Sequence, residues 1–131
     1  MVINPYAMAK IYFNARDEMT CVDTDLIAVV QAEGNYSRVV YITKREFMLS
    51  QGISKIEEIL HAHKDPQTRF VRLGRSVLVN HRYLYKIDIM KQLVILSDGS
   101  KEEIRLHLPK PIVKTYKKAI AMSLEKKGGI V

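Results

Sequence analysis

The stretch RFVRLGRSVLVNHRYLYKI, residues 69–87, combines a core-like apolar pattern with a high density of basic side chains. It holds five arginines and lysines, one histidine, and eight apolar side chains: Phe70, Val71, Leu73, Val77, Leu78, Val79, Leu84 and Ile87. Either the arginines lie on the outer face of ordinary strands, or the strands hold them against an anionic partner. The apolar spacing favours strands that pack into a sheet.

Short strands are also predicted on the N-terminal side of this stretch. Residues 9–13 and 18–23 each predict a strand, and the continuous apolar run within 25–34 predicts a buried one. Residues 33–35, with the sequence EGN, predict a turn, and β-branched and aromatic residues in 36–43 predict the strand that follows. Residues 44–50 predict its hairpin partner.

Two helices are predicted, one in mid-chain and one near the C-terminus. Residues 50–63 place Ile53, Ile56, Ile59 and Leu60 on one helical face, with Ser50 as the expected N-cap and an end before Asp65–Pro66. Residues 109–127 predict the second helix, with an apolar stripe of Val113, Tyr116, Ile120 and Leu124. Between the helices, residues 93–96 and 104–108 flank an SDGS turn, which predicts a hairpin.

The predicted fold class is therefore mainly β, with antiparallel strands in small sheets, one short mid-chain helix and a C-terminal helix. No strand–helix–strand alternation is present, which argues against a parallel α/β enzyme fold. With 131 residues and 47% hydrophobic residues, the chain suits a single domain. We expect an N-terminal arm at residues 1–9, the domain at 10–126 and a flexible tail at 127–131.

The balance of charge favours an anionic partner. The net charge is +7 with a pI near 9.5, which favours nucleic acid first and an anionic membrane surface second. The single cysteine, Cys21, is typical of an intracellular protein, and no apolar run approaches the roughly 20 residues of a membrane span. We expect a cytoplasmic protein that does not associate with a membrane.

Nothing in the sequence favours catalysis. His61 and His63 lie two residues apart near a helix end, so their side chains diverge, and Cys21 has no CxxC partner. No Gly-rich phosphate loop and no hydrolase or metalloprotease motif is present. We therefore expect no enzyme activity, no cofactor and no metal.

The basic residues are more informative because they are concentrated in the second half of the chain. Residues 101–131 hold eight Lys/Arg against three Asp/Glu, a net +5, and arginine dominates the cluster in 69–82. Arginine has a planar fork that suits bidentate contact with phosphate or with a guanine edge. An ordinary solvated outer face is the alternative explanation of such a cluster.

The order of these segments resembles the LytTR DNA-binding domain, over roughly residues 10–122. The resemblance rests on EGNY at 33–36, on the helix GISKIEEIL and on the Asp98–Gly99 turn. Its most specific part is the pattern F-x-R-x-x-R-S-x-x-V-N, here Phe70, Arg72, Arg75, Ser76, Val79 and Asn80. Such domains occur mostly at the C-terminus of bacterial response regulators in two-component systems.

The resemblance implies a largely β fold whose loops and strand ends enter successive major grooves of promoter sites. These sites are two imperfect direct repeats, and the DNA bends on binding. One implied contact region is Asn35, Tyr36, Ser37 and Arg38. In a second region, Arg75 is the strongest base-contact candidate and Ser76 is expected close to phosphate. Arg72 is either a phosphate contact or a strand-face residue, whereas Asn80 is expected to cap a turn and Phe70 to lie in the core.

The sequence departs from the family pattern at two places. A histidine is common before the R-S pair, and here it is Gly74. A Ser-Arg pair is usual at the end of the last strand, where His107 and Leu108 stand. His107 or Lys110 is the candidate for the third groove contact.

The sequence leaves more than one function open. The main interpretation is the double-stranded DNA-binding module of a transcriptional regulator, with a head-to-tail dimer on DNA as one arrangement. The alternative is a basic β module that binds a protein partner or anionic surface, with sequence-specific readout lost. RNA binding is less favoured, because no RNP-type motif surrounds the tyrosines. Nine residues precede the domain, too few for a receiver, so we expect either a piece of a longer regulator or a stand-alone one.

Overall fold

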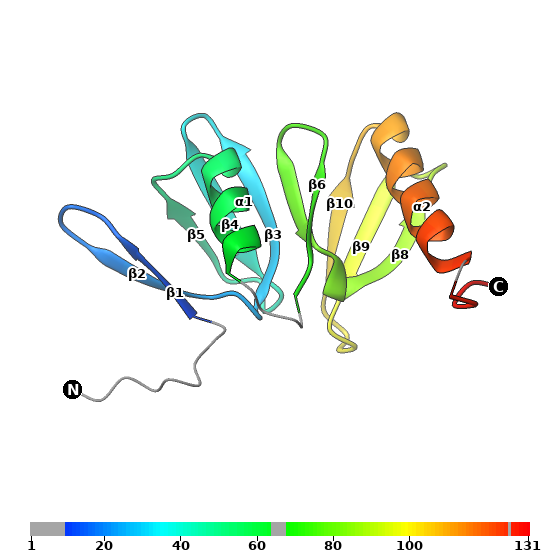
Figure 1. Ribbon diagram of the computed structural model, residues 1–131, viewed down its shortest axis with the longest axis horizontal. Helices are drawn as coiled ribbons and strands as arrows, with labels where there is room; N and C mark the ends of the chain where they lie inside the picture. Colours follow the sequence, from blue (N-terminus) through cyan, green and yellow to red (C-terminus); the bar gives the residue numbers. More distant parts are fainter. Residues whose placement is uncertain (1–9, 64–67, 126) are drawn as a thin grey trace. The chain divides into compact units, whose positions relative to one another are not determined.

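The chain folds into two compact units, which we call the N-terminal unit, through Arg82, and the C-terminal unit, from Tyr83. The computed structural model describes residues 10–63, 68–125 and 127–131. Within these residues it contains three antiparallel sheets and two α-helices (Figure 1). The predicted mainly β fold class with two helices is therefore confirmed. The predicted division into arm, domain and tail stays a prediction, and the arm lies outside the described residues.

A five-stranded sheet forms the main part of the N-terminal unit. Its strands are β3 (Ile27–Glu33), β4 (Tyr36–Tyr41), β5 (Glu46–Leu49), β6 (Phe70–Leu73) and β7 (Val77–Asn80), in the order β5-β4-β3-β7-β6. The first four residues of β3 are all buried, as expected for a continuous apolar run in a central strand. As the central strand of the sheet, β3 pairs with β4 on one side and with β7 on the other.

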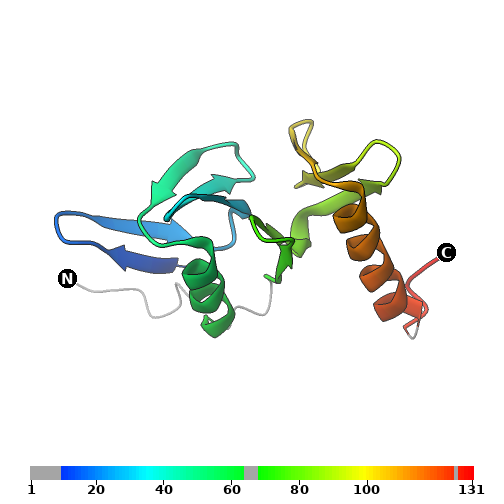
Figure 2. The same cartoon turned by 90° about the horizontal axis from the view of Figure 1, so that it is seen from above.

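Helix α1 (Ile53–Ala62) lies against this sheet (Figure 2). Ile53, Ile56 and Leu60 are buried in the core cluster, so the predicted helical face is confirmed. The predicted cap at Ser50 is wrong, because the N-cap is Gly52 and it makes no side-chain cap hydrogen bond. The Gln51 carbonyl accepts a hydrogen bond from Ser37 Oγ at 2.7 Å, which ties residue 51 to β4 and delays the start of the helix.

A two-stranded hairpin completes the N-terminal unit. It consists of β1 (Lys10–Asn14) and β2 (Met19–Asp23), which pair in register from Lys10–Asp23 to Asn14–Met19. An isolated two-stranded hairpin is marginal in water. This one is stabilised because Phe13 and Val22 reach the core cluster shared with α1 and the large sheet.

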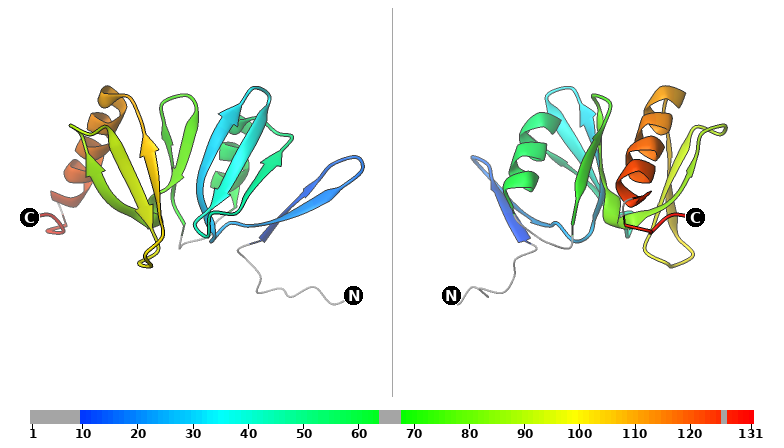
Figure 3. Two further views of the ribbon diagram at one scale, coloured as in Figure 1. Left: turned by 180° about the vertical axis from the view of Figure 1, so that it is seen from behind. Right: turned by 45° about the vertical axis from the view of Figure 1, so that its right-hand side comes forward.

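The C-terminal unit contains a three-stranded sheet and a helix. The strands are β8 (Leu84–Asp88), β9 (Leu93–Ser97) and β10 (Glu103–His107), in the order β10-β9-β8, and a 3₁₀ turn (His81–Tyr83) precedes β8. The helix, α2 (Lys110–Glu125), lies along the sheet (Figure 3). It buries Val113 and Tyr116, and burial raises the pKa of the Tyr116 hydroxyl. The SDGS hairpin and the closing helix are thus both confirmed.

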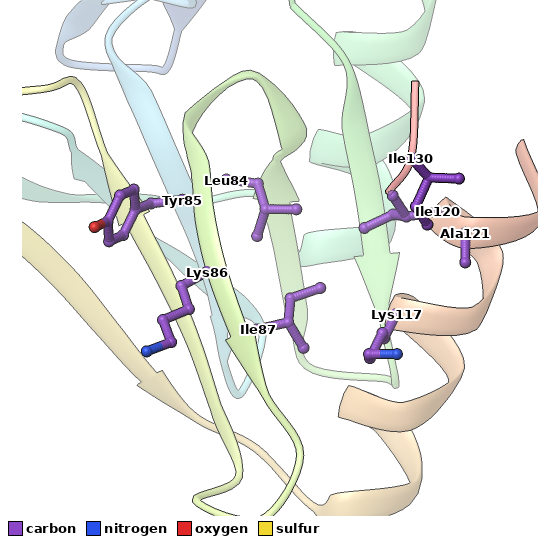
Figure 4. A pocket seen from close by; sticks show the side chains of 8 residues that line it. All are labelled: Leu84, Tyr85, Lys86, Ile87, Lys117, Ile120, Ala121 and Ile130. Carbon is purple, nitrogen blue, oxygen red and sulfur yellow. The ribbon is translucent and has the colours of Figure 1, made fainter. Parts of the chain in front are cut away.

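An apolar groove of about 240 Å³ separates β8 from α2. Leu84 and Ile87 point from β8 toward Ile120 of α2 and Ile130 of the tail, whereas Tyr85 and Lys86 point away (Figure 4). A register shift between Leu84 and Lys86 explains why this strand does not alternate strictly. The groove carries two lysines and no carboxylate among its lining residues.

Candidate nucleic-acid interface

The β3–β4 turn presents exposed polar groups at one end of the N-terminal unit. Glu33 pairs with Tyr36, which leaves Gly34 and Asn35 as a two-residue hairpin loop. Gly34 has φ of +61° and Asn35 does not have a positive φ, the arrangement in which a hairpin requires glycine at the first position. Asn35 is exposed, and Tyr36 exposes 55% of its surface. Both expected contact residues are therefore accessible to a partner.

The β6–β7 turn holds Gly74, Arg75 and Ser76 between the paired residues Leu73 and Val77. All three turn residues are exposed. Gly74 has φ of +67°, a conformation that costs side-chain-bearing residues about 1–2 kcal/mol. Glycine adopts this conformation without steric cost, so Gly74 suits the turn.

The two turns lie side by side at the same end of the N-terminal unit (Figures 1 and 3). The amide of Ala32, one residue before Glu33, donates to the Ser76 carbonyl at 2.8 Å. The start of α1 lies at this end as well, because a Cβ at Gly52 would contact the Asn35 carbonyl at 3.8 Å. We call the surface formed by Gly34–Tyr36 and Gly74–Ser76 the turn surface.

The guanidinium of Arg72 holds the backbone of the turn surface in place. Its Nη2 donates to the Arg75 carbonyl at 2.6 Å, and its Nη1 pairs with Glu57 of α1 at 2.8 Å. Its Nε is buried and has no hydrogen-bond partner within the described residues. The guanidinium is thus already occupied inside the unit, which favours the strand-face reading of Arg72 over a phosphate contact.

The other two residues of the first expected contact region are bound within the protein. Ser37 is completely buried, and its hydroxyl donates to the Gln51 carbonyl. Arg38 is partly exposed, but its Nε donates to Glu33 at 2.6 Å and its Nη1 lies 3.5 Å from Glu46. The hydrogen bond and the charge of Glu33 raise the pKa of Arg38, and the two carboxylates offset its attraction for an anion.

Asn80 and Phe70 have the structural roles expected from the sequence. Phe70 belongs to the core cluster. Asn80 is completely buried, and its Nδ2 donates to the Ile27 carbonyl at 3.0 Å. Its Oδ1 accepts from the amide of Arg82 at 3.2 Å, as an asparagine at a turn commonly does.

The third expected contact region lies in the C-terminal unit. His107 is the last residue of β10 and Lys110 is the first residue of α2, and both side chains are exposed. Leu108 between them is buried, and its amide donates to the Gln92 carbonyl at 3.0 Å. The Lys110 ammonium lies 3.9 Å from the sulfur of Met90, a weak acceptor.

Sequence reasoning missed the positioning residues around the turn surface. Glu57 is one of them, because it holds Arg72 through an ion pair. Its spacing gives a partial signal, because Glu57 lies four residues after Ile53 and one after Ile56, at the border of the buried stripe. The Gln51 carbonyl left no signal, since backbone acceptors are not visible in a sequence.

The described residues contain no group of three or more His, Cys, Asp or Glu side chains that could hold a metal ion. No helix in the described part of the chain is long and apolar enough to cross a membrane.

Comparison with known proteins identifies the family. The sequence profile of the LytTr DNA-binding domain matches residues 17–120. The fold is similar to a solved LytTr DNA-binding domain from Bacillus cereus, described as part of a methyl-accepting/DNA response regulator. That match has 15% sequence identity and a TM-score of 0.56, and it covers 86% of this chain and 96% of the other. No curated protein matches the chain. Since the profile covers most of the chain, this protein belongs to the LytTr DNA-binding domain family.

Proposed function

We propose that this chain is a transcriptional regulator that reads a specific sequence in double-stranded DNA with its turn surface. Membership of the LytTr DNA-binding domain family and the net charge of +7 both support DNA as the partner. Phosphate contacts position such a protein on the duplex, and a few contacts to base edges specify the sequence. The proposal therefore requires at least one exposed side chain that is held firmly enough to select a base.

Arg75 is that side chain, and its setting is the observation that carries the proposal. It is exposed in the β6–β7 turn, its own carbonyl is held by Arg72, and the carbonyl of the next residue is held by Ala32. Because these two bonds fix the backbone that follows the Arg75 Cα, less conformational freedom is lost when the guanidinium binds. An arginine in the major groove makes its commonest specific contact bidentately with guanine O6 and N7.

The neighbouring groups supply the rest of the proposed contact. Asn35 and Tyr36 contact the duplex beside Arg75, and Ser76 donates to a phosphate. The N-terminus of α1 adds partial positive charge at the same end. We assign Ser37 and Arg72 to positioning the two turns, since their polar groups are used within the protein. Arg38 is a secondary contact because its charge is offset by Glu33 and Glu46.

The C-terminal unit provides a separate contact through Lys110, with His107 beside it. Exposure of both side chains and the lack of a carboxylate partner for Lys110 in the described residues support this assignment. We further propose that the target consists of two direct repeats, bound by two copies of the chain arranged head to tail. A regulator that reads repeats spaced by one helical turn places both copies on the same face of the duplex.

Selection from a pool of random duplexes tests this function. Anisotropy titrations of the selected duplex and a scrambled duplex should follow, each over a range of salt concentrations. We expect a repeated motif spaced by about 10 bp and an affinity at least ~10³-fold above that for the scramble. Equal, salt-sensitive binding to both duplexes would contradict sequence-specific readout and would favour a protein partner or another anionic surface instead.

A further inference from the structure

Helix α2 carries a concentration of lysines that its fold does not use. Its first nine residues include four lysines and no acid, and the only carboxylate in the helix is Glu125 at its last position. The four lysines are all exposed: Lys110, Lys114, Lys117 and Lys118. We call these four residues the lysine stripe.

The lysine stripe occupies one side of the helix. With 3.6 residues per turn, positions 110, 114, 117 and 118 fall within an arc of about 100°. The residues that pack against the sheet, Val113 and Tyr116, project from the adjacent side and are buried. The stripe extends about 12 Å along the helix axis, at 1.5 Å per residue. It therefore begins at the proposed contact residue Lys110 and continues well beyond it.

This arrangement is unfavourable for the isolated protein. Cations in the first turns oppose the helix dipole, and Lys110–Lys114 and Lys114–Lys118 are like-charge pairs at i, i+4. In the part of the chain that the structure describes, no carboxylate lies within ion-pair distance of any of the four ammonium groups. An external polyanion would relieve this repulsion.

We propose that the lysine stripe binds the phosphate backbone of DNA and extends the Lys110 contact along α2. This inference rests on the proposed function. A membrane surface fits less well, because an interfacial helix needs an exposed apolar face beside its cations. In α2, Val113 and Tyr116 are buried against the sheet, and Ile120 is half-buried at the groove beside β8. Among the described residues of α2, Met122 is the one exposed large apolar side chain, which is too few to form an apolar stripe beside the lysines.

The test compares two triple variants of equal charge. The stripe variant is Lys114→Gln/Lys117→Gln/Lys118→Gln, and the control is Lys10→Gln/Lys86→Gln/Lys101→Gln, at three exposed lysines on β1, β8 and the β9–β10 turn. Each triple variant lowers the net charge from +7 to +4. Affinity for a random-sequence duplex and for the selected duplex is measured by anisotropy over a range of salt concentrations. Thermal unfolding in low salt is followed in parallel.

We expect the stripe variant to bind both duplexes about tenfold or more weakly than the unmodified chain. The slope of log K against log salt should fall by about 2 to 3, since each phosphate contact contributes about 0.9. The control should change the slope by less than about one contact. The ratio of specific to random affinity should stay constant, because phosphate contacts carry no sequence information. The unfolding temperature of the stripe variant should be unchanged or higher.

Equal effects of the two triple variants, or an unchanged slope in the stripe variant, would overturn the proposal. The proposal would also be overturned if the stripe variant lost its binding to phosphatidylglycerol vesicles but kept its affinity for DNA. If the stripe variant does not fold, the three single variants decide, each with an expected slope change of about one. If the unmodified chain bound the selected and the random duplex equally, only the proposed function would be refuted. The lysine stripe is tested separately, by the salt dependence of binding to random DNA.

Discussion

The two proposed contact regions of this protein are held in opposite ways. In the N-terminal unit, the carbonyls of Arg75 and Ser76 are hydrogen-bonded to Arg72 and Ala32, and a left-handed glycine sets the turn. In the C-terminal unit, Lys110 lies at the start of a helix, and its ammonium makes a weak contact with the sulfur of Met90. The first arrangement suits selection of one base, and the second suits attraction to a charged backbone. If the proposed function holds, rigidity of the turn, rather than charge, distinguishes the base-reading contact from the backbone contact.

The largest expected effect comes from removing the residue that fixes the turn surface. Arg72→Met keeps the length of the side chain but loses the ion pair with Glu57 and the hydrogen bond to Arg75. Hydrogen bonds to charged groups contribute about 1.5–3 kcal/mol each, and solvent screening of these partly exposed side chains lowers their combined contribution, so we expect a loss of about 2–3 kcal/mol in the free energy of unfolding. Urea denaturation measures it, and affinity for the selected duplex should fall as well.

Arg45→Met is the matched control for Arg72→Met, because Arg45 is an exposed arginine in the β4–β5 turn. It should leave both stability and DNA affinity nearly unchanged. If the two variants lose equal stability, Arg72 does not fix the turn in the way described.

Gly74→Ala should have the next largest effect, through backbone strain. The left-handed φ of Gly74 costs an alanine about 1–2 kcal/mol, and relief of that strain would move Arg75. Thermal unfolding should show the loss of stability, and titration of the selected duplex should show weaker binding. Gly52→Ser, at an extended φ of −72°, should not lower the stability, since serine is a good N-cap. An equally stable Gly74→Ala protein would contradict the strained-turn account.

Lys110→Ala should weaken binding to every duplex by a similar factor. One lost phosphate contact lowers the slope of log K against log salt by about 1 and leaves the preferred sequence unchanged. Lys101→Ala in the β9–β10 turn serves as the control, with little change expected. A change of preferred sequence in Lys110→Ala would show that Lys110 contacts a base rather than the phosphate backbone.

The smallest effect concerns pH. Burial, with a smaller contribution from the charge of Arg69, lowers the pKa of His81 below its usual 6.5. The unfolded chain then binds more protons than the folded one between that lowered pKa and about 6.5. Stability should therefore fall as the pH drops through this interval and level off below it. Urea midpoints from pH 7.5 to 5 measure this, and His81→Gln should flatten the curve.

Much of the fold followed from local patterns in the sequence. The apolar run before Gly34, the helical face of Ile53, Ile56 and Leu60, and the SDGS hairpin all rest on periodicity and turn chemistry, which neighbouring residues determine. The start of α1 did not follow, because it depends on a bond between Ser37 and Gln51, 14 positions apart in the sequence.

The candidate site was predicted less completely than the fold, for the same reason. Exposure of Asn35, Arg75 and Lys110 agrees with the roles implied by the family resemblance, and those roles stay predictions. Composition cannot separate an arginine that faces a partner from one that is used internally. Arg72 and Arg75 lie three residues apart in one motif, and only the position of Glu57 in space distinguishes them.

The most direct test of the central claim is the ratio of affinities for the selected and scrambled duplexes in Arg75→Ala, measured beside Lys110→Ala. We expect Arg75→Ala to lose about 1–3 kcal/mol of binding free energy on the selected duplex, with little change on the scramble, so that the ratio falls by about tenfold or more. Lys110→Ala should keep the ratio. Equal losses on both duplexes for Arg75→Ala would contradict readout by the turn surface.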